Sequence, residues 1–270
     1  MNVRLESRWS AIREASGSSD PFDRTSALAL AVKLIETALT AVGVERFGRE
    51  GVQARLARWE PISRLALDIP LRRAFEARNL AIHGVNFPGD ASEHVVALHD
   101  LWCAIRRSYV TKEKAASVAE DVLQSGIVRE VFLFGSLSRR KRRDSEPGDI
   151  DLLLFDTGEV SSFAASYWRI ARNPELLESE FLDADDRRAA SLCGWLDLVV
   201  IDGTRFGTDS AYTLSLCGNQ ADGLFFLNIA DALLKYERGG HWIADRPQVF
   251  ERLANLRRQL VTENIVSKRT

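Results

Sequence analysis

The sequence predicts an α+β protein, with an all-α first part and a second part that combines strands and helices. Between Thr25 and Val110, apolar residues recur every three or four positions, the spacing of helices that bury one face. After Gly126 the pattern changes to short runs rich in Val, Ile and Leu, bounded by Gly, Pro, Ser or Asp, which is typical of buried strands. The change of pattern near Val110 predicts two domains, residues 1–110 and residues 111–270.

Four helices are expected in the first domain. Apolar stripes predict two of them, one through Leu28, Ala31, Leu34, Ile35 and Leu39, the other through Val52, Leu56, Trp59, Ile62 and Leu65. A third is expected from near Pro70, which suits a first helical turn, to Gly84, which suits a helix end. After a loop of Asn, Pro, Gly and Asp, a fourth is expected from about Ser92 to Ser108.

The second domain is expected to begin with a helix and continue into a sheet. The segment from Thr111 to Gln124 has helical spacing, and Thr111 can cap its first turn. The predicted strands are Val128–Phe134, Ile150–Phe155 and Leu196–Ile201. Further helices are predicted around Phe163, Trp168 and Ile170, around Leu176, Leu177 and Phe181, from Leu224 to Leu234, and from Val249 to Leu260.

Composition and charge exclude several classes of protein. The 270 residues are 46% hydrophobic, too apolar for a disordered chain. No uncharged stretch reaches the roughly 18 residues that a membrane-spanning helix needs, and the charged N-terminus predicts no secretory signal. With 36 Lys and Arg against 38 Asp and Glu, the chain is no polycation that coats nucleic acid.

The cysteines favour a reducing compartment. Cys103, Cys193 and Cys217 are odd in number, widely spaced and not arranged as Cys-x-x-Cys. They are therefore expected to be buried thiols and not disulfides or zinc ligands, and the protein is expected to be cytoplasmic.

Three aspartates stand at predicted strand ends. Asp149 and Asp151 flank the start of the second predicted strand, where side chains two residues apart share a face. Two adjacent carboxylates repel each other, and a bound divalent cation relieves that repulsion; oxygen ligands favour Mg²⁺ or Mn²⁺. Asp197 opens the third predicted strand. If that strand lies beside the second, the three carboxylates converge on one edge of the sheet.

Gly135 and Ser136 follow the first predicted strand, where a helix is expected to begin. Free backbone N–H groups at a helix N-terminus attract phosphate, glycine allows a close approach of the backbone, and the serine hydroxyl adds a donor. Each feature alone would be an ordinary turn or cap. In this order, together with the three aspartates, they favour a phosphate and metal site.

The motif Gly135-Ser136, Asp149-Ile150-Asp151 and Asp197 resembles that of the polymerase-β-like nucleotidyltransferases, especially the minimal nucleotidyltransferases. The resemblance covers about the second half of the chain. It implies a short mixed sheet with flanking helices and transfer of a nucleoside monophosphate from an NTP to a hydroxyl. Gly135 and Ser136 would then hold the β- and γ-phosphates, and Asp149 and Asp151 would hold two Mg²⁺ ions. Asp197 would bind one of these ions and help to deprotonate the acceptor.

The loop between Ser136 and Asp149 departs from this family pattern. It is a little long, and Gly148 stands where the family usually has Ser, although neither difference removes a metal ligand. The loop carries five consecutive cations, from Arg139 and Arg140 to Arg143. They are either a solvated surface or contacts to triphosphate or an RNA backbone, with Arg139 and Arg140 as the candidate nucleotide-binding residues.

A second motif, Arg78-Asn79-Leu-Ala-Ile-His83, lies at the end of the third predicted helix. Asn79 and His83 are four residues apart and share a face, and the long Arg78 side chain can reach across. A histidine can act as a general acid or base near neutral pH, and an arginine can neutralise phosphate, so the pair could cleave RNA through its 2′-hydroxyl without metal. Ordinary helix capping by a surface Arg and His is the alternative.

This motif in a four- or five-helix domain resembles the HEPN family, whose Arg-x4-6-His motif forms a ribonuclease site, usually across a homodimer. HEPN and nucleotidyltransferase domains are frequent partners in toxin–antitoxin and phage-defence systems. The resemblance implies a homodimer formed through residues 1–110, with Arg78 and His83 as catalytic residues. Some HEPN domains serve only as binding or dimerisation modules.

The expected function is Mg²⁺-dependent transfer of NMP from an NTP, with ATP as the expected donor and AMP as the expected group, to a protein or RNA hydroxyl. Ribonuclease activity of the helical domain is a second expectation, and no membrane partner is expected. One alternative is a nucleotidyltransferase that modifies a small hydroxylated antibiotic. Another is a non-catalytic regulator that binds a nucleotide.

Overall fold

The structure is a computed structural model that divides into two compact units. The first comprises Met1–Tyr109 with Asp185–Trp195, and the second Val110–Ala184 with Leu196–Thr270. The residues described are 3–60, 68–83, 90–124, 126, 128–139, 147–156, 168–169, 193–205, 208–209 and 233–244. They form an α+β protein, as expected, with helices concentrated in the first unit and a mixed sheet in the second.

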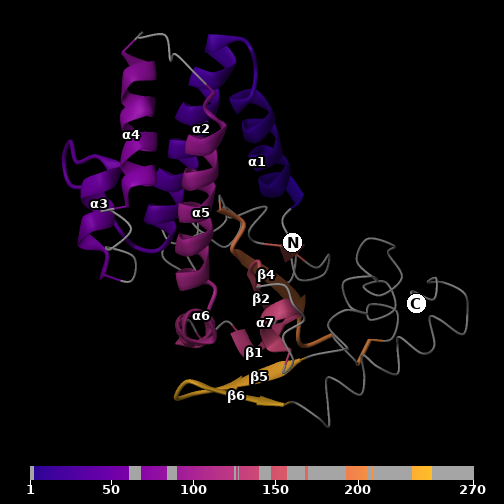
Figure 1. Cartoon of the computed structure of the whole chain (residues 1–270). Helices are drawn as coiled ribbons and strands as arrows, with labels where there is room; N and C mark the ends of the chain where they lie inside the picture. Colours follow the sequence, from indigo (N-terminus) through magenta and orange to yellow (C-terminus); the bar gives the residue numbers. More distant parts are fainter. Residues whose placement is uncertain are drawn as a thin grey trace, which may run out of the picture. The chain divides into compact units, whose positions relative to one another are not determined.

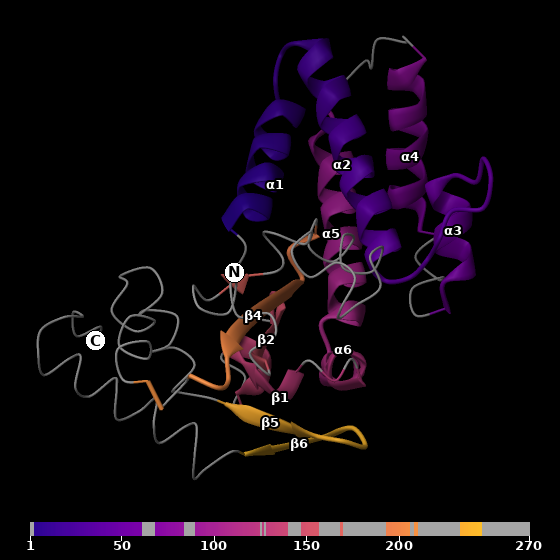
Figure 2. The ribbon, with the colours of Figure 1, turned by 180° about the vertical axis from the view of Figure 1, so that it is seen from behind.

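The first unit is built from helices. They are α1 (Val3–Ser16), α2 (Pro21–Ala41), α3 (Val52–Arg58), α4 (Ile69–Ile82) and α5 (Ser92–Tyr109). Helices α1, α2, α4 and α5 lie side by side with their axes roughly parallel, and α2 and α5 each pack against both α1 and α4 (Figures 1 and 2). The stripe of apolar residues predicted along α2 is buried at Leu28, Ala31, Ile35 and Leu39.

Local signals explain where α2 and α4 begin and end. The Asp20 side chain accepts a hydrogen bond of 2.8 Å from the Phe22 N–H, and Pro21 occupies the first turn of α2. Helix α4 also has a proline in its first turn and ends with His83 as its C-cap. Helix α3 ends at Arg58, with Trp59 as its C-cap, and is therefore shorter than predicted. Ile62 and Leu65, the last two residues of the predicted apolar stripe, lie outside the described residues.

An aromatic cluster forms part of the core of the first unit. The Trp102 ring lies between Trp9, at 5.9 Å between centroids, and Trp195, at 5.5 Å. His99 meets the Trp9 ring edge-on at 4.9 Å, and Tyr109 lies 5.7 Å from Trp195. Residues 193–195 therefore contribute to the helical core although they come late in the sequence.

The second unit is a six-stranded mixed sheet with two described helices. In chain order the elements are α6 (Lys112–Gln124), β1 (Val128–Phe134), α7 (Gly135–Ser138), β2 (Ile150–Asp156), β3 (Trp168–Arg169), β4 (Leu196–Asp202), β5 (Leu234–Glu237) and β6 (His241–Ala244). The strand order is β3-β4-β2-β1-β5-β6. Strands β2 and β4 are parallel, and every other neighbouring pair is antiparallel.

Helix α6 covers one face of this sheet. The Tyr236 hydroxyl donates a 2.9 Å hydrogen bond to Glu120, and Trp242 Nε1 donates a 3.2 Å hydrogen bond to the Lys112 carbonyl. The predicted cap is present, since Thr111 Oγ1 accepts a hydrogen bond of 3.1 Å from the Lys114 N–H. These contacts fix the hairpin of β5 and β6 to α6.

At two positions a predicted helix is wrong. Trp168 was expected in a helix and lies in β3, and Leu234, expected at the end of a helix, is the first residue of β5; the other residues named for the first of these helices, and residues 224–232 of the second, lie outside the described residues. Gly239 and Gly240 in the hairpin turn both have positive φ, 102° and 91°, which favours a hairpin connection. The other predicted helices beyond residue 156 lie outside the described residues.

Several further expectations can be compared with the structure. No described helix is long and apolar enough to cross a membrane. Cys193 is buried as expected, Cys103 is only half-buried, and neither of these two forms a disulfide; Cys217 lies outside the described residues. Helix α1 was not predicted, because only Trp9 and Ile12 of its described apolar residues face the core.

Candidate active site

Two of the three aspartates are neighbours across the sheet. Asp151 of β2 is the Cα partner of Asp197 of β4 in the parallel register. Side chains of register partners project from the same face, and neighbouring strands lie roughly 4.8 Å apart. Both residues are partly exposed, although the Oδ1 atom of Asp197 is buried. Because Asp151 pairs with Phe134 of β1, strand alternation places it on the face opposite to the one covered by α6.

Asp149 precedes β2 and is buried, with 8% of its surface exposed. It lies one residue before β2, and extending the alternation of the strand to it would place it on the same face as Asp151. The predicted pairing of Asp149 with Asp151 thus rests on alternation, whereas that of Asp151 with Asp197 rests on observed register.

Gly135 lies directly against the Asp151 carboxylate. Its φ of +69° is in the left-handed region, where side chains are disfavoured. A Cβ added to Gly135 would stand 2.9 Å from Asp151 Cγ and closer still to Oδ2. Glycine is therefore required here for two independent reasons, and the chain reversal after β1 and the aspartate of β2 form one packed unit.

The reversal after β1 is held by a serine that the sequence did not single out. Ser138 is buried, at 3% exposed, and its hydroxyl donates a 3.0 Å hydrogen bond to the Gly135 carbonyl. Ser136 is exposed. Helix α7 spans only four residues, Gly135–Ser138, so its macrodipole is small, and the exposed Ser136 hydroxyl and neighbouring backbone N–H groups are the available phosphate donors.

The residues present can be tested against a hard divalent cation. Asp151 and Asp197 offer carboxylate oxygens from adjacent positions, the ligand type that Mg²⁺ and Mn²⁺ prefer. In the part of the chain that the structure describes, no group of three or more His, Cys, Asp or Glu side chains is arranged to hold a metal. The donor set fits such a cation as a pair, Asp151 and Asp197, and the structure does not group Asp149 with both of them.

The basic loop is described only at its start. Arg139 directly follows α7 and is exposed. Arg140 and the rest of the cluster, through Arg143, lie outside the described residues.

The second predicted motif lies at the end of α4. Arg78 is half-buried and donates a 3.2 Å hydrogen bond from Nη1 to Asn79 Oδ1. Asn79 is exposed, and its carbonyl accepts the backbone N–H of His83 at 3.2 Å, so one helical turn joins the two residues. The His83 side chain is exposed just beyond the helix. Arg78 and Asn79 are in contact, and His83 lies a turn further along the chain.

Comparison with known proteins adds no family to these observations: no family model, no curated protein and no solved structure matches the chain.

Proposed function

We propose that this protein is a metal-dependent nucleotidyltransferase that moves a nucleoside monophosphate, with AMP as the expected group, from an NTP to a hydroxyl on a protein or RNA. One observation supports the proposal above the others. Gly135 packs against the carboxylate of Asp151, and Asp197 is the register partner of that same aspartate. A phosphate-binding turn and two metal-binding carboxylates would then lie within one small part of the sheet.

In this proposal each residue has a separate task. The backbone beyond Gly135, with the Ser136 hydroxyl, holds the β- and γ-phosphates, and Arg139 and Arg140 neutralise charge near them. Asp149, Asp151 and Asp197 hold Mg²⁺ or Mn²⁺. When bound, the metal neutralises charge that develops on the transferred phosphoryl group. Asp197 also takes the proton from the acceptor hydroxyl; the oxygen attacks the α-phosphorus and pyrophosphate leaves.

The test is label transfer by the full chain. The protein is incubated with each α-labelled NTP, Mg²⁺ and cell extract, and label is followed into protein, RNA and small molecules. Asp151→Asn and Asp197→Asn are expected to lower the rate by about a hundredfold or more, because each removes a charge that stabilises the transition state. Unfolding curves of both variants establish that they remain folded.

A second aspartate pair provides a matched control. Asp156 and Asp202 are also register partners, at the opposite end of the same two strands. Asp156→Asn and Asp202→Asn should therefore leave transfer within about twofold of the unmodified protein. Full activity in Asp151→Asn, or equal losses in the two pairs, would contradict the assignment.

Two other outcomes would favour the alternative functions. Label that enters only small hydroxylated compounds would favour an antibiotic-type transferase. Nucleotide binding without turnover of any NTP would favour a non-catalytic regulator.

The helical unit supports a second, separate proposal. Arg78 and Asn79 are in contact and His83 is exposed one turn later, an arrangement compatible with HEPN-type RNA cleavage across a homodimer in a toxin–antitoxin or phage-defence system. His83→Ala should abolish RNA cleavage measured in EDTA and leave label transfer unchanged. Cleavage that requires Mg²⁺ and survives this substitution would contradict the proposal.

A further inference from the structure

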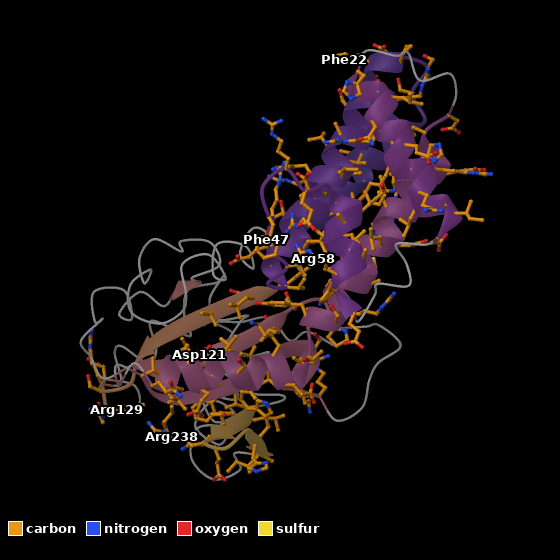
Figure 3. All side chains as sticks on the ribbon, turned by 90° about the vertical axis from the view of Figure 1, so that its left-hand side faces the viewer. Phe22, Phe47, Arg58, Asp121, Arg129 and Arg238 are labelled. Carbon is orange, nitrogen blue, oxygen red and sulfur yellow. The ribbon has the colours of Figure 1, made fainter. Side chains whose placement is uncertain are left out.

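The loop between α2 and α3 presents an aromatic ring to solvent. Phe47 is 64% exposed, and its neighbours Arg46 and Arg49 are exposed as well. The Arg58 side chain, from α3, lies against the ring, with its guanidinium carbon 4.6 Å from the ring centroid. Figure 3 shows the two side chains next to each other on the helical unit.

Hydrogen bonds hold this loop in one shape. Arg58 donates from Nε and Nη2 to the two carboxylate oxygens of Glu50, at 2.8 and 2.6 Å, and from Nη2 to the Glu45 carbonyl at 2.8 Å. The Glu50 N–H donates to the Phe47 carbonyl at 3.1 Å, which closes a turn containing Gly48 at a φ of +59°. The turn fixes the backbone of Phe47.

A buried arginine fixes the base of the same loop. Arg55 is 3% exposed and donates from Nε to the Val44 carbonyl at 3.1 Å and from Nη2 to Thr40 Oγ1 at 3.1 Å. The ring of Phe47 is therefore presented by a preorganised loop, so that little conformational entropy would be lost if a ligand stacked on it.

The loop carries Arg46 and Arg49 against one carboxylate, Glu45, that Arg58 does not neutralise, so the balance of charge around the ring favours an anionic, planar ligand. Glu50 is neutralised by its two hydrogen bonds to Arg58. Among the described residues, no hydrogen bond or ion pair engages Arg46 or Arg49. An exposed aromatic ring with unpaired cations on both sides has the chemistry of a stacking site for single-stranded nucleic acid, where a base covers the ring and cations meet the phosphates.

We propose that this loop, residues 45–50, binds single-stranded nucleic acid, with one base stacked on Phe47 and flanking phosphates on Arg46 and Arg49. The inference is independent of nucleotide transfer and of RNA cleavage. A lone exposed aromatic residue is ordinary on a protein surface. Phe22 is such a residue, being 75% exposed at the other end of the helical unit with no described arginine over its ring (Figure 3).

The test measures binding of fluorescein-labelled oligoadenylate and oligodeoxyadenylate of about 12 nucleotides to the full chain by anisotropy, in EDTA and without NTP. Phe47→Ala should weaken binding by about 5- to 150-fold, since stacking on one base is lost, while Phe47→Trp should retain it. Phe22→Ala, the matched control, should bind like the unmodified protein. Comparison of the oligoadenylate with the oligodeoxyadenylate shows whether the single strand that binds is RNA or DNA.

The salt dependence tests the two cations separately. The slope of log K against log salt concentration should become shallower by about 1.4 in the Arg46→Gln, Arg49→Gln double variant, because two phosphate contacts are lost. Three results would overturn the proposal: no binding of either oligonucleotide at about 50 mM salt, unchanged binding by Phe47→Ala, or an equal loss in Phe22→Ala. Selective binding of an acidic peptide would assign the loop to a protein partner instead. None of these results depends on whether Asp151 supports transfer.

Discussion

At the scale of the residue, Gly135 affects both the backbone conformation after β1 and the candidate site, because it has a left-handed φ and packs against Asp151. Gly135→Ala should lower the free energy of unfolding by about 1–2 kcal/mol through its left-handed φ, and the added Cβ must displace the Asp151 carboxylate. Nucleotide transfer should be lost as a consequence. Urea unfolding and label transfer measure the two effects.

The control for this substitution lies at the other end of the connection between β1 and β2. A Cβ added to Gly148 meets no atom of the described residues within 4 Å. Gly148→Ala is therefore expected to change the unfolding free energy by less than about 0.5 kcal/mol and to keep transfer. If Gly135→Ala were as stable and as active as Gly148→Ala, the packing of Gly135 on Asp151 would have no functional role.

Cys193 predicts a pH dependence of stability. Burial raises the pKa of its thiol from 9.0 to about 12. Above pH 9 the unfolded chain releases this proton and the folded chain keeps it, so stability falls as pH rises from about 9 towards 12, by up to about 1.4 kcal/mol per pH unit. Unfolding free energies measured between about pH 8 and about pH 10 should fall less steeply in Cys193→Ala than in Cys103→Ala. Parallel curves for the two variants would show that the buried thiol does not contribute.

At the scale of the element, the predictable parts are those in which local pattern and burial agree. Strands β1, β2 and β4 agree with their predicted bounds to within one residue, because each is an apolar run buried in the sheet. The β5–β6 hairpin was missed because each strand has only four residues; Leu234 and Tyr236 do alternate with Lys235 and Glu237 in β5, but this alternation is too short to stand out after the apolar stretch from Leu224 to Leu234. A pair of glycines in the turn was the available signal.

The candidate site, too, could be predicted from the sequence only where its features depend on local pattern. The spacing of Asp149 and Asp151 follows from the sequence, since alternation along a strand is a local property. The pairing of Asp151 with Asp197 depends on which strands are neighbours, and the sequence left that as a condition. The buried hydroxyl of Ser138 and the ring of Phe47 could not be inferred, because both depend on how a turn folds back on itself.

At the scale of the whole molecule, the chain leaves the first unit, enters the second, and returns to the first before it completes the second. The first unit ends at Tyr109, but residues 193–195 belong to it, and the chain then passes directly into β4 with Asp197. Trp195 is 1% exposed, and its ring packs between those of Trp102 and Tyr109. The helical core is thus completed by a residue that follows the first three strands of the sheet in sequence.

This arrangement predicts which helices are destabilised when the Trp195 side chain is removed. Trp195→Ala should destabilise the helical unit by about 3–5 kcal/mol, because truncation of a buried Trp removes apolar contacts and leaves a cavity beside Trp102. Hydrogen exchange of the full chain should then show faster exchange in α5, with α6 unchanged.

Trp242→Ala is the matched variant. The Trp242 indole donates a hydrogen bond to the Lys112 carbonyl, so its removal should accelerate exchange in α6 and leave exchange in α5 unchanged. Equal acceleration of both helices by Trp195→Ala would mean that the two units unfold together, and an unchanged α5 would mean that residues 193–195 contribute nothing to the helical core.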